Sequence, residues 1–548
     1  MRSNVPNEAV VRPPHDAAQS YRALPLWDDI TIPQMLRRTA AAHPSRVAVV
    51  TLDDSLMYAE LDRRSDAFAV GLLSCGLEPG DPVLFQLGNC VEFTVAWYGT
   101  LKAGLLPVAT LPVHDLNELV PISAQIRPRA HLIQGDLERR PLGDLAAALR
   151  REQPSIEHTI TVRSPTSARD ATYDALIADG GVPPPSPAGP DDVAVFQLSG
   201  GTTGTPKIIP RFHAEYLYNA RLHADFWDYD DTTAVLHVLP LVHNAGVSAA
   251  MHPAHAMGSR LVMGAPTPDS IAATMATLRP TDMLVTPGLA AAIVAATKAG
   301  TLDTGSLRNL TVAGQRLPLA LADEIETVLG IPCTQLFGMG EGMFLATPRD
   351  GSEWGRKNTV GVPYSSADEI RIYEPGTQTP VTPGDVGELC CRGPYTIRGY
   401  YAAPEHNAVA FTPDGFYRTG DLARADDIEG QTWYAIEGRI KDLINRGAEK
   451  INAEELENLI FRHPAVAQVA LVAVPDERLG ERACACVVPA PGTAELSLDD
   501  LCAFLLSQGV AKFKLPEYLQ LFDALPVTTV NKVDKRALRS AVADLASG

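Results

Sequence analysis

The feature that most constrains the fold is a regular alternation of short apolar runs and helical patterns between residues 191 and 337. The runs that predict strands are Asp191–Leu198, Ala234–Leu239, Ser259–Met263, Asp282–Val285, Leu310–Val312 and Thr334–Phe337. The stretches that predict helices between them are Asp269–Leu278, Leu289–Lys298 and Pro318–Leu329. Strands that alternate with helices in this way form mostly parallel sheets with helices on their faces. We therefore predict an α/β fold for this part of the chain.

The segments on either side predict how the chain divides. Residues 31–180 alternate in the same way, with a helical pattern at Tyr58–Cys75, and a Pro-rich linker follows at Val182–Pro190. After Thr359 the segments become shorter and turn-rich, which favours a small antiparallel subdomain. The end of the chain predicts a helix at Ala453–Arg462, a strand at Val466–Val474 and a helix at Leu498–Ser507. We predict a large N-terminal domain over residues 1–440 and a C-terminal α+β domain over residues 441–548.

Composition argues against several classes of partner. The 46 Lys and Arg against 65 Asp and Glu give a net charge of −19, which argues against nucleic acid or an anionic membrane surface. No apolar run approaches the ~20 residues that a membrane span needs, and the N-terminus lacks the features of a signal peptide. The eight cysteines include no C-x-x-C pair, which favours the reducing cytoplasm.

Four histidines lie within a short stretch and raise the question of a transition-metal site. They are His237, His243, His252 and His255. None of them has H-E-x-x-H spacing, and His252 precedes a proline. Packing in a helix or loop is the favoured interpretation.

A candidate phosphate-binding loop follows the first predicted strand directly. Its residues are Ser199, Gly200, Gly201, Thr202, Thr203 and Gly204, followed by Thr-Pro and Lys207. The glycines allow backbone N–H groups to converge on anionic oxygens, the threonines add hydroxyl donors, and Lys207 adds a positive charge. A flexible Gly/Thr turn is the plain alternative, and Pro206 shows that this is not a Walker A loop.

This loop, SGGTTGTPK, resembles the phosphate loop of the adenylate-forming superfamily, which comprises acyl-CoA synthetases, peptide-synthetase adenylation domains and luciferases. The superfamily's other segments follow in order, over nearly the whole chain from about Leu26. They are HN at 243–244, FGMGE at 337–341, YRTGD at 417–421, GRIKD at 438–442, NRG at 445–447 and a P-x5-K pattern ending at Lys532. The stretch RGPYTIRGYY at 392–401, with residues 404–421, resembles stand-alone aryl-acid–AMP ligases for 2,3-dihydroxybenzoate and salicylate.

The resemblance implies a site for ATP and Mg²⁺. Lys207 and its loop would hold the β- and γ-phosphates, and Glu341 would hold Mg²⁺, although an acid at a helix N-terminus is a common alternative. Many relatives carry Thr or Ser before this Glu, whereas Gly340 offers no hydroxyl. Phe337 would stack on adenine, with the backbone around Gly314 and Leu336 closing the pocket; a bare aromatic would more often lie in the core.

Ribose contacts and the C-terminal residues are implied in the same way. Asp421 would accept both ribose hydroxyls, beside Arg439; alone, the Asp would suit a turn after Gly420. Lys532 would bridge the substrate carboxylate and the α-phosphate, although a bare lysine near a C-terminus is usually solvated. Lys441 falls at the superfamily's hinge, so the resemblance implies a mobile C-terminal domain that rotates between two half-reactions. Gly447 would then help to form the tunnel for a thiol.

The resemblance also implies an acyl pocket. In aryl-acid ligases the Asn at position 244 hydrogen-bonds an ortho-hydroxyl group, and His243 lines the carboxylate end; a turn Asn is the alternative. Ala245 stands where the family commonly has an aromatic, and Ala249 stands where a dihydroxybenzoate enzyme offers Ser. Both changes favour a substituted or bicyclic hydroxyaryl acid. The remaining expected pocket residues are Gly338 and Phe344.

The function that we predict is ATP-dependent activation of an aryl acid to aryl-AMP, followed by transfer to the phosphopantetheine thiol of an aryl carrier protein. No G-G-x-S carrier motif follows Lys532, so this carrier is expected to act in trans. The alternatives are an aryl-CoA ligase, a catalytically silent relative that only binds an acyl-adenylate, and a luciferase-type oxygenase. The combination of Lys207, Glu341, Asp421, Arg439 and Lys532 argues against the silent relative.

Overall fold

The computed structural model describes residues 7–24, 26–137, 141–163, 171–199, 206–447, 449–476, 478–492, 496–528, 533–543 and 545. The chain forms two compact units. The first comprises Met1–Lys357, Gly361–Glu369 and Cys391–Tyr417, and the second comprises Asn358–Val360, Ile370–Cys390 and Arg418–Gly548. Parallel and antiparallel sheets with helices confirm the predicted α/β class.

A nine-stranded sheet forms one half of the first unit. Its strands are, in spatial order, β15 (Val362–Pro363), β14 (Phe344–Ala346), β13 (Cys333–Gly338), β12 (Asn309–Ala313), β11 (Asp282–Val285), β9 (Ala234–His237), β10 (Arg260–Met263), β1 (Val47–Val50) and β2 (Ser55–Met57). All neighbours from β13 to β1 pair in parallel, and β15, β14 and β2 add antiparallel edges. The predicted parallel arrangement is confirmed.

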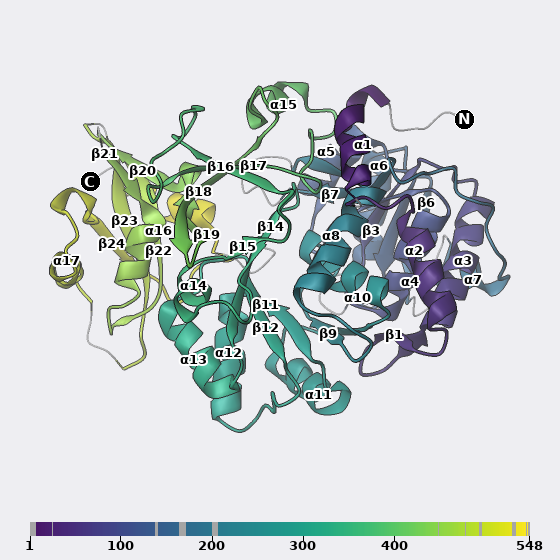
Figure 1. The fold of residues 1–548 in the computed structure, drawn as a ribbon, viewed down its shortest axis with the longest axis horizontal. Coiled ribbons are helices and arrows are strands. Elements are labelled where there is room, and N and C mark those ends of the chain that lie inside the picture. The colour runs from purple at the N-terminus through teal and green to yellow at the C-terminus, as the bar shows by residue number, and fades with distance from the viewer. Residues whose placement is uncertain are drawn as a thin grey trace. The chain divides into compact units, whose positions relative to one another are not determined.

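Helices α11 (Pro268–Leu278), α12 (Pro287–Lys298) and α13 (Leu319–Leu329) flank this sheet beside β11 and β12 (Figure 1). Thr267 begins α11 by accepting a hydrogen bond from the Ser270 N–H. Gly330 ends α13 in the left-handed conformation, with φ 69°. Ile271, Ile293 and Ile325, one from each helix, bury their side chains against the sheet. This burial explains why apolar residues recur at helical spacing in all three stretches.

A six-stranded sheet forms the other half of the first unit. Its order is β6 (His158–Val162), β5 (Ala130–Gln134), β3 (Pro82–Gln86), β4 (Leu106–Val108), β7 (Val193–Leu198) and β8 (Ile208–Phe212). All pairs are parallel except β7–β8, which is antiparallel. The remaining helices of the first unit are α1 (His15–Ala23), α2 (Ile32–Ala42), α3 (Tyr58–Ser74), α4 (Val91–Lys102), α5 (Leu116–Ile126), α6 (Leu142–Glu152), α7 (Tyr173–Ala178), α8 (His213–Phe226), α9 (Asn244–Gly246), α10 (His252–Met257), α14 (Glu353–Asn358) and α15 (Pro404–Ala410).

The second unit holds most of a four-stranded sheet and all of a five-stranded one. The first has the order β16 (Glu369–Tyr373), β17 (Gly387–Arg392), β18 (Tyr417–Ile428), β19 (Gln431–Arg439). The second has the order β21 (Glu449–Asn452), β20 (Leu443–Arg446), β23 (Gly480–Pro489), β22 (Val466–Asp476), with β24 (Tyr518–Leu521) beside β23. Its helices are α16 (Ala453–Ile460), α17 (Leu498–Ser507) and α18 (Lys535–Ala541). Cys484 and Cys486 are free and buried in β23, as strand packing predicts.

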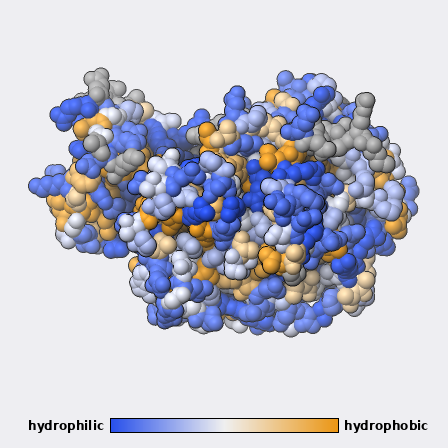
Figure 2. All heavy atoms as spheres, turned by 45° about the horizontal axis from the view of Figure 1, so that its top comes forward, coloured by the Kyte–Doolittle hydropathy of each residue, from blue (hydrophilic) through white to orange (hydrophobic). Residues whose placement is uncertain are grey.

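Hydrophilic residues cover most of the face shown in Figure 2, and apolar residues appear there in small groups. Among the described residues, no helix combines the length and the apolar character that crossing a membrane requires.

Candidate active site

The two ends of the predicted phosphate loop lie together. The Ser199 N–H donates to the Lys207 carbonyl at 2.9 Å, and the Lys207 N–H donates to the Ser199 hydroxyl at 2.9 Å. These bonds extend the β7–β8 hairpin, in which Leu198 is opposite Ile208. The other predicted loop residues, namely Gly200, Gly201, Thr202, Thr203 and Gly204, lie outside the described residues.

Tyr400 brings Lys207 and Glu341 to one place. The Lys207 ammonium lies 5.3 Å from the centroid of the Tyr400 ring. The Tyr400 hydroxyl donates to Glu341 Oε1 at 2.7 Å and lies 2.9 Å from the Tyr417 hydroxyl. Burial, with the Glu341 charge beside it, raises the pKa of Tyr400, so the phenol stays a neutral donor. A positive and a negative side chain from distant parts of the chain therefore share one small region.

The turn that carries Glu341 is fixed through its backbone. It joins β13 to β14, so Glu341 does not lie at a helix N-terminus. Its carbonyl accepts from the Ile397 N–H at 2.8 Å and from Arg211 Nη1 at 3.3 Å. Gly342 has a φ of +135°, and a Cβ there would lie 2.4 Å from the Thr396 Cα. Only glycine fits this close approach. The turn is therefore held between the segment with Thr396 and Ile397 and the side chain of Arg211.

The residues expected around adenine lie at the carboxyl ends of two parallel strands. Ala313 at the end of β12 is opposite Leu336 in β13, and Gly314 follows with a φ of +88°. Leu336 is buried, whereas Phe337 is half-buried and therefore is not a core aromatic. Ligands of α/β folds bind at such carboxyl edges. Gly314, Leu336 and Phe337 are thus in one place, as the sequence interpretation requires.

Asn244 is held by two tyrosines. Its Oδ1 accepts from the Tyr216 hydroxyl at 2.9 Å and from the Tyr395 hydroxyl at 3.5 Å. The amide nitrogen makes no hydrogen bond within the described part of the chain, and it is not sealed from solvent. His243 precedes it, half-buried, and its Nδ1 accepts from the Ala245 N–H at 3.3 Å. Asn244 therefore lies in a short helix, not in a turn, with a donor available to a ligand.

Gly338 and Phe344 are neighbours across two strands. They face each other in the antiparallel β13–β14 pair. A Cβ on Gly338 would lie 2.4 Å from the Phe344 ring. That ring is 3% exposed and meets Tyr364 and Tyr395 edge-on, with centroids 5.7 and 5.6 Å away. The structure thus joins Phe344, through Tyr395, to Asn244.

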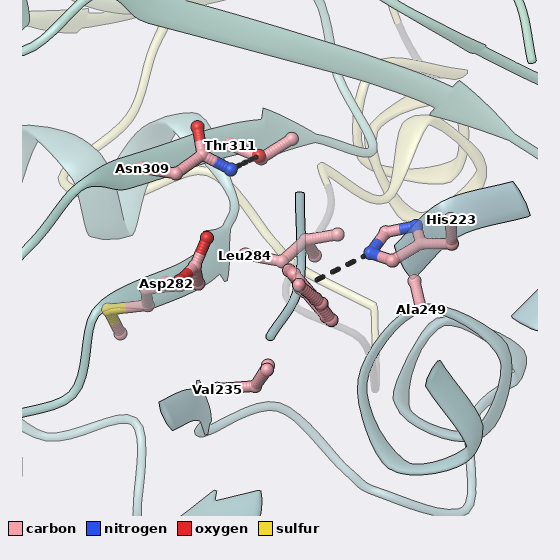
Figure 3. A pocket seen from close by; sticks show the side chains of 9 residues that line it. His223, Val235, Ala249, Asp282, Leu284, Asn309 and Thr311 are labelled. Carbon is pink, nitrogen blue, oxygen red and sulfur yellow. Dashed lines mark hydrogen bonds between the residues drawn. The ribbon is translucent and has the colours of Figure 1, made fainter. Parts of the chain in front are cut away.

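Ala249 lines a small buried cavity (Figure 3), whereas Ala245 is half-buried. The volume open to the centre of a water molecule is about 10 Å³, which is room for about one water. Polar side chains on its walls include His223, Asp282, Asn309 and Thr311. Burial lowers the pKa of His223 to about 3 and raises the pKa of Asp282 to about 6. The sequence interpretation of Ala249 as added space did not identify these polar walls.

The second unit holds the residues expected at the ribose. Asp421 and Arg439 are opposite each other in β18 and β19, and Arg439 Nε lies 2.8 Å from Asp421 Oδ1. The Asp421 side chain is 6% exposed and that of Arg439 is 49% exposed. Asp421 thus lies in a strand, which contradicts its reading as a simple turn residue.

The remaining predicted residues of this unit lie around its first strands. Lys441 lies in a 3₁₀ turn between β19 and β20, and desolvation, with Arg439 nearby, lowers its pKa. Gly447 has a φ of +65°, and its N–H donates to the Leu479 carbonyl at 2.6 Å. Lys532 lies outside the described residues; Val527 and Val533, which flank its segment, form an antiparallel bridge.

Three of the four clustered histidines lie in the core. His237, His252 and His255 are fully buried; Trp97 donates to His252 at 3.2 Å, and the Tyr98 hydroxyl lies 2.7 Å from His255. In the described residues, no three His, Cys, Asp or Glu side chains converge as a metal site would need.

Several functional neighbours were missed by sequence reasoning. They are Arg211, Tyr216, Tyr395 and Tyr400. Tyr395 and Tyr400 belong to the RGPYTIRGYY stretch, whose tyrosines were a signal for hydrogen-bonding partners. Arg211 and Tyr216 follow the phosphate loop, but no motif or spacing in the sequence indicates that they contact the site.

Comparisons with known proteins agree with this geometry. Residues 36–401 match the family described as AMP-binding enzyme, and residues 455–532 match the AMP-binding enzyme C-terminal domain. The chain is 40% identical to a Streptomyces salicylyl-CoA synthase / salicylate adenylyltransferase, over 98% of each chain. It is 35% identical to the Bacillus subtilis 2,3-dihydroxybenzoate-AMP ligase, over 97% of each. The apo structure of Mycobacterium smegmatis MbtA is similar with a TM-score of 0.75 and 37% identity, over 97% of this chain and 99% of that one.

The family match spans both the strand edge with Phe337 and the segment that ends at Tyr401. The resemblance of the ordered sequence segments is therefore confirmed over most of the chain. On these grounds, the chain belongs to the AMP-binding enzyme family.

Proposed function

We propose that the protein activates a hydroxy-substituted aryl acid with ATP, forming aryl-AMP and pyrophosphate, and then passes the acyl group to the phosphopantetheine thiol of a carrier protein. One observation carries the choice of acid. Asn244 is buried beside the rings of Tyr216 and Tyr395, whose hydroxyls occupy its oxygen, and its N–H₂ group is available. The names of the curated relatives, which include salicylate and 2,3-dihydroxybenzoate, support the same class.

In the first half-reaction a carboxylate oxygen attacks the α-phosphorus and pyrophosphate leaves. Lys207 would lie against the phosphates, because its loop is closed at the base and its ammonium lies over the ring of Tyr400, whose hydroxyl binds Glu341. Positioning and charge neutralisation are the main contributions that a protein makes to such a step.

The donor set also fits a magnesium ion. Mg²⁺ in nucleotide sites is commonly held by one or two carboxylates together with phosphate oxygens and water. Glu341 offers one carboxylate, and only one of its oxygens accepts from Tyr400. The ion would neutralise charge on the phosphates, while Tyr400 orients the carboxylate that holds it.

Nucleotide recognition would use an adenine group of residues and a ribose group of residues, each with its own geometry. Phe337, with Gly314 and Leu336, would take adenine, since the three lie at one strand edge. Asp421, already fixed by Arg439, would accept the ribose hydroxyls.

The C-terminal domain, residues 441–548, would take part in both half-reactions. Lys532 would bridge the carboxylate and the α-phosphate during adenylation, and rotation at Lys441 would bring Gly447 to the path of the thiol. The partly desolvated position of Lys441 and the left-handed turn at Gly447 are compatible with these roles.

Coenzyme A is the second candidate for the thiol. One relative's name includes a salicylyl-CoA product, and its adenylating step would be the same. The two acceptors differ only in the second half-reaction.

Pyrophosphate exchange into ATP tests the proposal. The panel contains benzoate, salicylate, 2,3-dihydroxybenzoate, bicyclic hydroxyaryl acids and aliphatic acids. We expect exchange with one or more 2-hydroxyaryl acids. Exchange with aliphatic acids alone would overturn the substrate class, and absence of exchange with every acid would overturn the activity. Single-turnover transfer to a phosphopantetheinylated carrier or to coenzyme A then identifies the acceptor.

A further inference from the structure

A buried ion pair lies between the turn that carries Glu341, called the metal turn below, and Asn244 with the tyrosines that bind it. Arg211, on β8 four residues after Lys207, is fully buried, and Glu215 in the first turn of α8 is 1% exposed. Arg211 Nη2 lies 3.4 Å from Glu215 Oε2. Burial raises the pKa of Glu215 to about 7, against the opposing effect of Arg211. Since buried ion pairs contribute little net stability, this pair calls for another explanation.

The guanidinium of Arg211 binds three backbone carbonyls. Nη2 donates to Tyr395 at 2.6 Å, and Nη1 donates to Glu341 at 3.3 Å and to Gly340 at 3.4 Å. Two of these carbonyls belong to the turn that presents the Glu341 carboxylate. A planar fork of donors can hold several acceptors in fixed directions, which a lysine cannot do. Arg211 Nε is buried and has no partner among the described residues, which shows that the site is not optimised for stability.

The same guanidinium contacts the rings that hold Asn244. Its central carbon lies 3.9 Å from the Tyr395 ring centroid and 5.6 Å from that of Tyr216. The hydroxyls of both rings bind Asn244 Oδ1. One side chain therefore touches the backbone of the metal turn and the supports of the amide that faces the acid.

We infer that Arg211, with Glu215 as its counter-ion, is a positioning residue that sets two features together: the placement of the Glu341 carboxylate and the orientation of the Asn244 amide. Because Asn244 Oδ1 is occupied, the amide is fixed as a donor, so the recognised ortho substituent must be a hydrogen-bond acceptor. This inference rests on the proposed function, since it assumes that Asn244 faces an aryl acid.

Arg211→Lys is the decisive variant, because it keeps the charge beside Glu215 and removes the fork. Pyrophosphate exchange gives two readouts: the Mg²⁺ concentration for half-maximal rate, and the ratio of kcat/KM for salicylate to that for benzoate. We expect the Mg²⁺ requirement to rise about tenfold and the ratio to fall about tenfold. Equal loss on both acids at an unchanged Mg²⁺ requirement would overturn the inference.

A matched control is Arg356→Lys. Arg356 is also a largely buried arginine that binds a carboxylate, Glu326, at 2.9 Å, and a backbone carbonyl, that of Gly351. It contacts neither Glu341 nor Asn244 in the described structure, so both readouts should stay at wild-type values. If Arg356→Lys changed both readouts as much as Arg211→Lys does, the effect would be a general one of destabilisation, and the inference would be overturned.

Tyr395→Phe separates the effect on Asn244 from the effect on Glu341. It also tests the inference if Arg211→Lys does not fold. It keeps the ring under Arg211 and the Tyr395 carbonyl, and it removes one hydroxyl from Asn244. We expect the salicylate-to-benzoate ratio to fall several-fold while the Mg²⁺ requirement is unchanged; an unchanged ratio would overturn the inference. Failure of the wild-type protein to use any aryl acid would instead contradict the proposed function.

Discussion

At the scale of single residues, the Asn244 amide is the most direct test of substrate class. Asn244→Ala removes a buried donor that a 2-hydroxybenzoate would use and that benzoate has no group to accept. An unpaired polar group in such a site costs about 1–3 kcal/mol, so kcat/KM for salicylate should fall about five- to 150-fold more than that for benzoate. Steady-state kinetics on both acids measure this difference. Equal losses would remove Asn244 as the group that recognises the ortho substituent.

Asp282 predicts a pH dependence of stability. Burial raises its pKa from 3.8 to about 6, with the Thr281 hydroxyl donating to Oδ2 at 2.6 Å. The folded protein therefore binds this proton more tightly than the unfolded chain does. The associated stability is fully present below pH 3.8 and is lost as the pH rises through about 6.

Asp282→Asn should remove this dependence. Between pH 5 and 7 the wild-type protein should lose about 1 kcal/mol more than the variant, seen as a larger fall in Tm. Thermal unfolding at both pH values measures it, with Asp53→Asn on an exposed loop as the control. Parallel Tm changes in wild type and Asp282→Asn would contradict the assignment.

At the scale of elements, the packing at the carboxyl end of β13 requires a glycine at position 338. Gly338→Ala would place a Cβ 2.4 Å from the Phe344 ring, and overpacking of this kind costs about 1–3 kcal/mol. We expect a lower Tm and weaker binding of aryl acids, because the displaced ring also contacts Tyr395. Phe344→Leu in the same chain should restore part of both.

The control for that variant is Gly143→Ala in α6. A Cβ there meets no atom within 4 Å, and alanine is the better helix former. Its Tm should be unchanged or higher. If Gly338→Ala behaved in the same way, the close packing of Gly338 on Phe344 would be refuted.

Sequence patterns correctly predicted the parallel core and the antiparallel character of the subdomain after Thr359, but not the full length of its longest strand. Asp282–Val285 and Leu498–Ser507 match β11 and α17 residue for residue, because the first is a short run buried at every position and the second buries residues at helical spacing. By contrast, β18 extends over Tyr417–Ile428, where the sequence indicated a turn-rich stretch. Gly420 within it has a φ of +71°, and polar residues alternate there. Its strand character comes from pairing with β19, which no local signal predicts.

The candidate site shows the same division. Lys207 and Glu341 stand in recognisable segments, but the phenol of Tyr400 that joins them comes from a third. Arg211 shows why such partners were missed: its contacts are to carbonyl groups and ring faces, which any residue or any aromatic can supply. Sequence spacing marks the residues that face a ligand, whereas the residues that hold them depend on tertiary packing.

At the scale of the whole molecule, the domains predicted from the sequence differ from the two compact units of the structure. The predicted boundary at residues 440 and 441 remains a prediction, and the family matches lie on either side of it. In the structure, β18 and β19 belong with the C-terminal part: Asn452 Nδ2 donates to the Glu437 carbonyl at 2.5 Å, and α16 lies against β19. Asp421 and Arg439 are therefore grouped with the C-terminal segments by packing, although they precede the predicted hinge.

The two half-reactions give the last test. If Lys532 acts only when the C-terminal domain is placed for adenylation, Lys532→Ala should reduce pyrophosphate exchange by about a hundredfold or more and should leave transfer from supplied aryl-AMP to the thiol nearly intact. Lys512→Ala, which removes an exposed lysine of the same unit, is the control and should affect neither step. Rapid-quench assays of each half-reaction measure the two rates separately. Equal loss in both would contradict a domain rotation between the steps, because a lysine that serves only one arrangement cannot be needed for both.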